Sequence, residues 1–153
     1  MTIYLVRHGR AGDRNKWQGP DDLRPLSKGG RRQAQALVEQ LADRPIGRVV
    51  SSPCVRCRQT VEPLAEQRRL PVDLADALAE GAPLAESLRL IEKVTPEEAV
   101  LCTHGDVLGN LLAHYEQRDV PLGADVRLEK GSTWELEIAE GEVVAARYHP
   151  PPA

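Results

Sequence analysis

The chain has 153 residues with 41% hydrophobic content, which is enough for one buried core and short for two ordinary domains. We therefore expect a single domain over residues 1–153. The formal net charge of −3 gives no electrostatic reason to bind nucleic acid or a membrane surface. No basic-then-apolar leader opens the sequence, and no apolar stretch approaches the ~20 residues that span a bilayer, so a cytoplasmic protein is expected.

The three cysteines, Cys54, Cys57 and Cys102, are an odd set in a chain without a secretion leader, so no disulfide framework is expected. Cys54 and Cys57 have the spacing of half a four-cysteine zinc site, but no second pair or His-rich motif follows them. We predict no metal and no cofactor, and interpret the pair as helix residues. Because Cys54 and Cys57 flank Arg56, oxidation of these cysteines is a possible route to inactivation.

The first predicted element is a buried strand over Ile3–Val6, an apolar run that ends directly at Arg7-His8-Gly9. The segment from Arg10 to Leu26 holds glycine, proline and charged residues without an apolar period. It is therefore expected to be a loop over the end of the strand. Trp17 either anchors this loop over a site or pins it to the core.

A helix and a second strand are predicted next. Ser27 is the expected cap of an amphipathic helix, because apolar residues recur behind it at helical spacing. The second strand is predicted around Arg48–Ser51. Ser52 is then the expected cap of another helix with Pro53 at its first position, and Pro63 is expected to kink or split that helix.

The second half of the chain continues the alternation of strand and helix. A short strand is predicted at Leu70–Leu74, followed by a helix that Pro83 opens. A buried strand is predicted at Ala99–Thr103 and ends at His104-Gly105. Asp106 is the expected cap of the helix that follows it.

The end of the chain has a different pattern. Apolar and polar residues alternate over 133–138, and a second stretch follows Glu140-Gly141 and reaches Tyr148, which predicts a hairpin at a sheet edge. Strands that alternate with helices before a terminal hairpin are typical of the α/β class. We therefore expect a three-layer α/β/α sandwich whose central sheet is mainly parallel and carries a C-terminal edge hairpin.

Residues suited to phosphate chemistry follow three of the predicted strands. Arg7-His8-Gly9 follows the first, Arg56 lies in the helix after the second, and His104-Gly105 follows Ala99–Thr103. Ligands of open parallel sheets gather at the carboxyl ends of the strands, so these side chains are expected in one pocket. Guanidinium groups present forked donors that match phosphate oxygens, and a neutral imidazole is a nucleophile. The pattern indicates a site for a phosphoryl group.

With these residues in place, the chain resembles the histidine phosphatase superfamily, which has the phosphoglycerate-mutase-like fold. Three motifs carry the resemblance in order: Arg7-His8-Gly9, then Ser51-Ser52-Pro53 with Arg56, Gln59 and Thr60, then Thr103-His104-Gly105. Arg24-Pro25-Leu26-Ser27 with Gly30 and Gln33-Ala34 is also similar. In length the chain is closer to the SixA-type phosphohistidine phosphatases than to the mutases.

A second resemblance concerns a particular branch of the family. The stretches Val61–Ala65, Leu78–Gly81 and Lys130–Trp134 are similar to the histidine phosphatase domain that some bacteria fuse behind a Nudix hydrolase domain. No Nudix part stands within these 153 residues.

The chemistry of the residues and the resemblance imply the same roles. His8 is expected to attack phosphorus as a neutral imidazole and to form a phosphohistidine. Arg7 and Arg56 are expected to hold the phosphate oxygens and oppose their charge. His104 is expected on the far side of the phosphoryl group, where it stabilises the equatorial oxygens.

Two glycines and one glutamate complete the predicted site. Gly9 and Gly105 are expected to contact the substrate, because their backbone can pass close to the phosphate and Gly105 opens a helix. Glu80 lies between the second and third motifs, where the larger branch of the family carries its acid, and is the expected proton donor. SixA-type enzymes lack that acid, since a phosphoramidate leaving group needs less help. Glu80 is therefore either catalytic or a solvated loop residue.

Other polar residues of the loop over 10–26 are further candidates for phosphate contacts. Asn15 is offset by one residue from a phosphate-contacting asparagine of the mutases, so that role is not transferred. Arg10, Arg14 and Lys16 either recognise a second phosphate or an acidic partner, or they are solvated charges.

The sequence thus predicts a metal-independent phosphatase that hydrolyses phosphomonoesters of a small metabolite or nucleotide through a phosphohistidine on His8. One alternative is a SixA-like protein phosphohistidine phosphatase, whose partner would be a phosphohistidine protein. Another is a non-catalytic phosphate-binding partner of a Nudix-type protein. Specificity is expected to come from the loop over 10–26 and the segment after Glu80, because the motifs recognise only the phosphoryl group.

Overall fold

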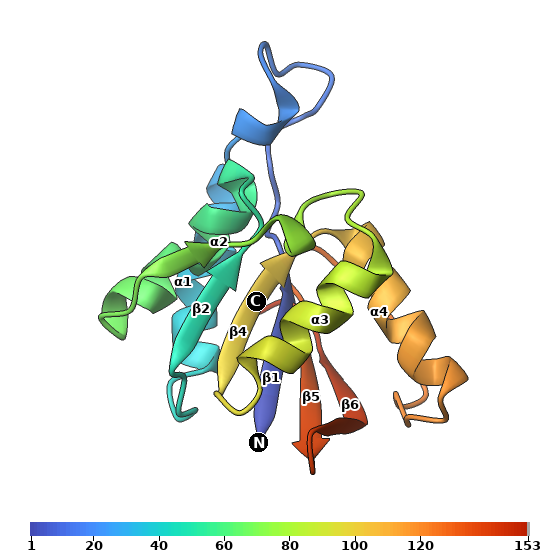
Figure 1. Cartoon of the computed structure of the whole chain (residues 1–153). Helices are drawn as coiled ribbons and strands as arrows, with labels where there is room; N and C mark the ends of the chain where they lie inside the picture. The colour runs from blue at the N-terminus through green and yellow to red at the C-terminus, as the bar shows by residue number, and fades with distance from the viewer. Residues whose placement is uncertain (153) are drawn as a thin grey trace.

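The structure, a computed structural model, describes residues 1–152 and consists of one six-stranded sheet with helices on both faces (Figure 1). The strand order is β3-β2-β4-β1-β5-β6. The strands are β1 (Thr2–Arg7), β2 (Arg48–Ser51), β3 (Val72–Leu74), β4 (Ala99–Thr103), β5 (Thr133–Ala139) and β6 (Glu142–His149). The helices are α1 (Lys28–Gln40), α2 (Val55–Gln67), α3 (Leu84–Val94) and α4 (Gly105–Gln117), with short 3-10 turns η1 (Asp21–Leu23) and η2 (Asp76–Leu78).

The sheet confirms the predicted α/β sandwich with a mainly parallel centre. Strands β3, β2, β4 and β1 run parallel, and the β5–β6 hairpin adds antiparallel to β1. The hairpin supplies the edge strand β6, as expected. Residue 153 lies outside the described residues, and the prediction of a single domain over 1–153 stays a prediction.

The register of the parallel strands aligns their carboxyl ends. Arg7 of β1 lies opposite Thr103 of β4, and Ser51 of β2 lies opposite Cys102 of β4. The three segments that follow these strands therefore leave the sheet side by side. In Figure 1 the segment from 10 to 26 projects beyond this same end of the sheet. Side chains that are far apart in the sequence can thus meet there.

Two apolar layers hold the helices against the sheet. Successive residues of β1 point to opposite faces, so Ile3 and Leu5 pack with α3 and α4, while Tyr4 and Val6 pack with α1 and α2. Strand β4 is buried along its whole length. Strands covered on both faces are expected to be continuously apolar, which explains why these two runs were clear in the sequence.

The predicted helix starts at Ser27 and Pro83 are confirmed, and those at Ser52-Pro53 and Asp106 are wrong. Ser27 caps α1, since its hydroxyl accepts a hydrogen bond from the Gly30 amide at 3.2 Å. Pro83 is the cap residue of α3. The helix after β2 begins at Val55, not at Pro53, and Cys54 stands at its cap position. The Ser52 hydroxyl lies 2.8 Å from Nε2 of His104, and it also accepts a hydrogen bond from the Cys54 amide at 3.3 Å.

Pro63 neither splits nor ends α2, which continues from Val55 to Gln67. A proline inside a helix removes one backbone hydrogen bond and crowds the preceding turn. Here the neighbouring residues Val61, Leu64 and Ala65 are buried in the core. Packing of that face holds the helix together across the proline.

The predicted roles of Asp106 and Trp17 are also corrected. Asp106 is not the cap of α4, where His104 holds the cap position without a side-chain bond. Its carboxylate accepts a hydrogen bond from the Gly81 amide at 2.8 Å. Trp17 is 37% exposed and donates to the Pro20 carbonyl, so it stabilises its own loop and does not reach the core.

Within residues 1–152, none of the helices is long and apolar enough to cross a membrane.

The close approach of α1 to the segment after β1 generates a first prediction. A Cβ at Gly30 would lie 1.9 Å from the Arg10 carbonyl oxygen, which is backbone and cannot move aside alone. Gly30→Ala should therefore lower the free energy of unfolding by about 2 kcal/mol or more. Urea denaturation followed by circular dichroism measures the change.

Gly29→Ala is the matched control in the same helix. The nearest atoms to a Cβ at Gly29 are 3.8 Å away, so alanine fits and should leave stability unchanged or raise it by up to ~1 kcal/mol. Equal effects of the two substitutions would contradict the proposed close approach.

Candidate active site

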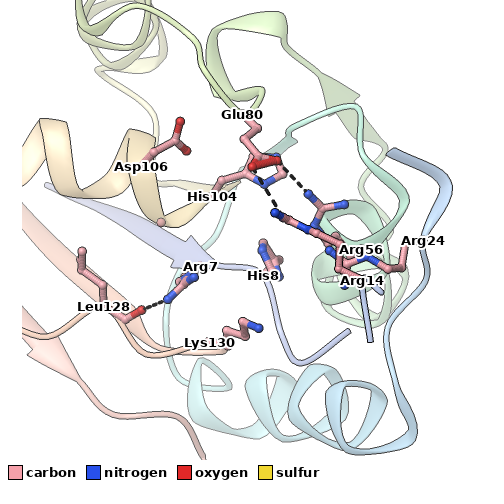
Figure 2. A pocket seen from close by; sticks show the side chains of 11 residues that line it. Arg7, His8, Arg14, Arg24, Arg56, Glu80, His104, Asp106, Leu128 and Lys130 are labelled. Atoms are coloured by element: carbon pink, nitrogen blue, oxygen red, sulfur yellow. Dashed lines mark hydrogen bonds and ion pairs between the residues drawn. The ribbon is translucent and has the colours of Figure 1, made fainter. Parts of the chain in front are cut away.

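A pocket of about 580 Å³ lies at the carboxyl ends of β1, β2 and β4 (Figure 2). It is lined by Arg7, His8, Arg14, Arg24, Arg56, Glu80, His104, Gly105, Asp106, Leu128 and Lys130. The structure thus brings together every catalytic residue predicted from the sequence. Of the two glycines, Gly105 is at the pocket wall, whereas Gly9 lies behind His8 and acts through its backbone.

His8 is buried, with 6% of its surface exposed. Its Nδ1 lies 2.8 Å from the Gly9 carbonyl oxygen, which can only accept a hydrogen bond. The ring proton therefore stands on Nδ1, and Nε2 carries the free lone pair. Burial lowers the pKa of His8 from 6.5 to about 3, opposed by the Gly9 carbonyl and assisted by the charges of nearby groups. The imidazole is neutral at physiological pH, as a nucleophile requires.

Thr60 ties the His8 segment to α2. Its hydroxyl accepts from the Gly9 amide at 2.9 Å and donates to the Arg56 carbonyl at 2.7 Å. Gly9 was expected to contact the substrate through its backbone, but its amide is used here to fix the segment after β1. Thr60 therefore sets the distance between the strand that carries His8 and the helix that carries Arg56.

Arg7 lies along the wall formed by the start of α4. Its Nη1 donates to the Leu128 carbonyl, and a Cβ at Gly105 would lie 3.0 Å from its Cζ. Only glycine lets the guanidinium approach this closely. Burial lowers the pKa of Arg7, and the Asp106 carboxylate opposes that shift. The Nε of Arg7 is buried without a hydrogen-bond partner among the described residues.

Arg56 is 1% exposed and is held by two carboxylates. Its Nη2 lies 3.1 Å from Glu80 Oε2 and 3.2 Å from Asp21 Oδ2, while Nη1 donates to the Asp21 carbonyl at 2.8 Å. Figure 2 shows Glu80 directed toward both Arg56 and Arg14. A buried guanidinium needs such partners, because an unpaired charge in this position would be costly.

His104 faces His8 across the pocket. The two ring centroids lie 5.4 Å apart in an edge-to-face arrangement. The Nε2 of His104 is 2.8 Å from the Ser52 hydroxyl and 3.5 Å from the Cys57 sulfur. Its Nδ1 has no hydrogen-bond partner among residues 1–152 and is the ring nitrogen available to a ligand.

Glu80 is placed by contacts on both sides of it. The Thr103 hydroxyl donates to the Leu78 carbonyl at 2.7 Å, and Asp106 accepts from the Gly81 amide at 2.8 Å. Gly81 has a φ of +82°, a conformation that favours glycine. These contacts connect the loop of Glu80 to the end of β4 and the start of α4.

The cysteines lie beneath the pocket. Cys57 and Cys102 are completely buried, and Cys54 is nearly so. Burial opposes ionisation of Cys57, yet hydrogen bonds from Cys102 and His104 lower its pKa to about 6. Burial raises the pKa of Cys102. Among the described residues no group of three His, Cys, Asp or Glu side chains is placed to hold a metal ion.

Some of the cations of the pocket, and their counter-ions, were not predicted from the sequence. Arg24 is 5% exposed and bonds to Asp21 Oδ1 at 3.0 Å and to the Gly12 carbonyl at 2.6 Å. Lys130 enters from the segment before β5. Both residues stood within segments that carried the family resemblance, which was the only available signal. Arg14, weighed as a possible phosphate contact, does reach the pocket.

The chain matches known proteins in sequence as well as in the chemistry of its pocket. An α/β sheet with paired histidines and arginines at its carboxyl end defines an anion-binding pocket. Residues 3–83 match the family model of the histidine phosphatase superfamily (branch 1). The 8-oxo-(d)GTP phosphatase of Mycolicibacterium smegmatis is 38% identical over 156 residues, which cover 99% of this chain. The chain belongs to the histidine phosphatase superfamily.

The relatives differ from this chain in length. The aligned region covers 48% of the Mycolicibacterium smegmatis protein, and 56% of a probable phosphatase of Schizosaccharomyces pombe that is 30% identical over 77% of this chain. The chain thus spans about half the length of the curated relatives it matches.

Solved structures show the same fold. The protein histidine phosphatase SixA complexed with tungstate gives a TM-score of 0.78 over 100% of this chain and 97% of that chain, at 18% identity. The mycobacterial glucosyl-3-phosphoglycerate phosphatase with inorganic phosphate gives 0.71 over 99% and 97%, at 22% identity. These likenesses confirm the phosphoglycerate-mutase-like fold.

The depressed pKa of His8 generates a prediction about stability. The folded protein keeps His8 neutral down to about pH 3, whereas the unfolded chain takes up this proton near pH 6.5. The unfolded state therefore binds more protons between these values, and stability falls as pH falls, by up to about 1.4 kcal/mol per pH unit from this group. Urea denaturation at pH 7, 6, 5 and 4 measures how the free energy of unfolding changes with pH.

His8→Asn removes the titrating group and supplies the comparison. The wild-type protein should lose more stability than the variant between pH 6.5 and 4, since carboxylates such as Asp21 contribute equally to both. Parallel curves for the two proteins would show that His8 titrates normally in the folded state.

Proposed function

We propose that the protein is a metal-independent phosphatase that transfers a phosphoryl group to His8 and then to water. The observation that carries the proposal is the hydrogen bond from His8 Nδ1 to the Gly9 carbonyl, which leaves the Nε2 lone pair free beside the pocket's cations. Arginine side chains supply the positive charge that phosphoryl transfer requires.

The first step is phosphate binding. The phosphate oxygens take donors of Arg7 and Arg56, and the Asp21 and Glu80 carboxylates give up their contacts with Arg56. Nδ1 of His104 meets the oxygens from the side opposite His8. The amides at the start of α4, beginning with Gly105, have no partners within the helix and add donors.

The second step is transfer of the phosphoryl group. Nε2 of His8 forms a bond to phosphorus while the bond to the leaving oxygen breaks, and the electron pair goes to that oxygen. The Nδ1–H bond to Gly9 becomes stronger as the ring gains positive charge. Water then attacks the phosphohistidine, the Nε2–P bond breaks, and inorganic phosphate is released.

Glu80 serves as acid and base in these two steps. Once phosphate takes over Arg56, the half-exposed Glu80 carboxylate takes up a proton from water or from the incoming phosphate, and then donates it to the alkoxide leaving group. It then accepts a proton from the attacking water. Its placement by Gly81 and Leu78 supports this role over that of a solvated loop residue.

The substrate that we propose is a phosphorylated small metabolite or nucleotide. The relative in Mycolicibacterium smegmatis is named for action on a nucleotide, 8-oxo-(d)GTP. A pocket of about 580 Å³ is within the range of small-molecule sites and is larger than one phosphate needs.

The likeness to SixA favours a second candidate, a protein phosphohistidine phosphatase. A phosphoramidate leaving group needs little acid, so this activity would not depend on Glu80. A non-catalytic phosphate-binding partner of a Nudix-type protein is less favoured. A module that only binds phosphate has no need of a histidine held in its nucleophilic tautomer.

The proposed mechanism predicts a covalent intermediate. Protein quenched in alkali during turnover of an aryl phosphate should carry one phosphoryl group that is stable to alkali and labile to acid, detected by intact mass. His8→Ala should lack the adduct and lose at least about 10³-fold in kcat, because the nucleophilic route is gone. An adduct that persists in His8→Ala would exclude His8 as the nucleophile.

Glu80→Gln separates the two candidate activities. It should lower kcat for an alkyl phosphomonoester by about 10²-fold or more, with little change for phosphoramidate. Glu86→Gln, an exposed residue of α3 away from the pocket, is the matched control and should leave both rates unchanged. Equal losses with both substrates in Glu80→Gln would assign Glu80 to binding instead of proton transfer.

A further inference from the structure

The pocket holds more positive charge than a single phosphoryl group uses. Five cationic side chains line it against two carboxylates. Arg7 and Arg56 are sufficient for the oxygens of the group that is transferred. Arg24 is neutralised by Asp21 at 3.0 Å. Lys130 and Arg14 remain, and they occupy the more open part of the same pocket.

Lys130 has no counter-ion. Its ammonium has no ion pair or hydrogen bond with any residue among 1–152. Desolvation lowers its pKa, and so do the charges of Arg7, Arg24, Arg14 and Arg56. The exposed Lys130 ammonium thus lies near several guanidinium groups without an acidic partner among residues 1–152, and an anion bound beside it would offset this repulsion.

The position of Lys130 is fixed by its backbone. The Lys130 carbonyl accepts from Gln33 Nε2 at 3.0 Å, and the next amide, of Gly131, lies 3.1 Å from the Arg7 carbonyl and 3.0 Å from the His8 carbonyl. Gly131 has a φ of +84°, and a Cβ there would lie 2.7 Å from Gln33 Nε2. The backbone at Lys130 and Gly131 is therefore hydrogen-bonded to the segment that carries His8, which holds Lys130 beside the nucleophile.

Arg14 is held only loosely by its partners. Its side chain is 64% exposed and lies 3.6 Å from Asp21 and 3.7 Å from Glu80. Exposed pairs at such distances contribute little, so an anion can replace them. In Figure 2 Lys130 lies on the side of His8 opposite Glu80, while Arg14 comes from the loop over the pocket.

We propose that Lys130 and Arg14 form a subsite for a second phosphate, and that the substrate ends in a di- or triphosphate chain whose terminal phosphoryl group is transferred to His8. This inference rests on the proposed function and specifies its substrate class. The bond that breaks is then a phosphoanhydride. The electron pair goes to the bridging oxygen, which leaves as part of the shortened phosphate chain stabilised by the two cations.

The charge of this substrate class matches the pocket. A terminal phosphate and its neighbour together bring about three negative charges, which Arg7, Arg56, Arg14 and Lys130 can balance. A phosphohistidine side chain brings only one phosphoryl group and would leave Lys130 without a partner. The same is true of a monoester on an uncharged metabolite.

Binding of simple anions tests the subsite without turnover. In a His8→Ala background, isothermal titration should show inorganic pyrophosphate binding at least about tenfold more tightly than orthophosphate, as expected for added charge-assisted contacts. Lys130→Gln in this background should reduce the preference for pyrophosphate to about threefold or less. Arg14→Gln should also reduce the preference for pyrophosphate. Lys16→Gln, an exposed loop lysine outside the pocket, should leave the preference unchanged.

The outcomes separate this inference from the proposed function. Orthophosphate binding without a preference for pyrophosphate would overturn the second subsite and leave the phosphoryl site intact. A Lys130→Gln variant that weakens both anions by the same factor would also overturn it, because the lysine would then act as a general charge. Failure of the parent to bind either anion would count against both proposals.

Discussion

The hydrogen bond between His8 Nδ1 and the Gly9 carbonyl is the interaction on which the site depends. It fixes the proton on one ring nitrogen and frees the other, while burial keeps the ring neutral. This bond needs a backbone turn immediately after β1. The turn is held in place by Thr60 from α2 and by Gln33 from α1, whose Oε1 accepts from the Arg10 amide at 2.8 Å.

The remaining residues of the site are held to the same framework. Gln33 also bonds to the Lys130 carbonyl, and Thr60 bonds to the Arg56 carbonyl. Thr103 and Asp106 position the loop of Glu80. Gln33, Thr60 and Thr103 thus act mainly on backbone groups, and they fix the backbone from which the charged side chains of the site extend. Such support by neighbouring residues is what fixes the geometry of a functional site.

Local sequence patterns were sufficient to predict the central strands, the first helix and the position of the site. The apolar runs of β1 and β4 are covered on both faces, so their residues identify them as buried strands and their ends as the site. Ser27 was recognised as a cap because its bond to Gly30 is local. Reactive residues at three strand ends could be grouped, since parallel strands end at one edge of the sheet.

The predictions that proved wrong, and the site residues that were not predicted, depend on hydrogen bonds between segments distant in the sequence. Ser52 looked like a cap, but its hydroxyl lies at His104, which is 52 residues away. Asp106 bonds to Gly81 and not to its own helix. Lys130 reaches the pocket only because Gln33 and the end of β1 hold its backbone. None of these pairings has a periodicity or spacing that reveals it in a single sequence.

The ion pairs of Arg56 have a consequence for product release. In the empty pocket this guanidinium is already paired with Asp21 and Glu80, so an arriving phosphate exchanges one anionic partner for another. The net gain in affinity is smaller than the strength of the new contacts. In the proposed reaction, the inorganic phosphate left after hydrolysis would meet the same competition from the two carboxylates, and their return to Arg56 would assist its departure. The acidic residues that pair with Arg56 would thereby favour release of the product that the proposed mechanism forms.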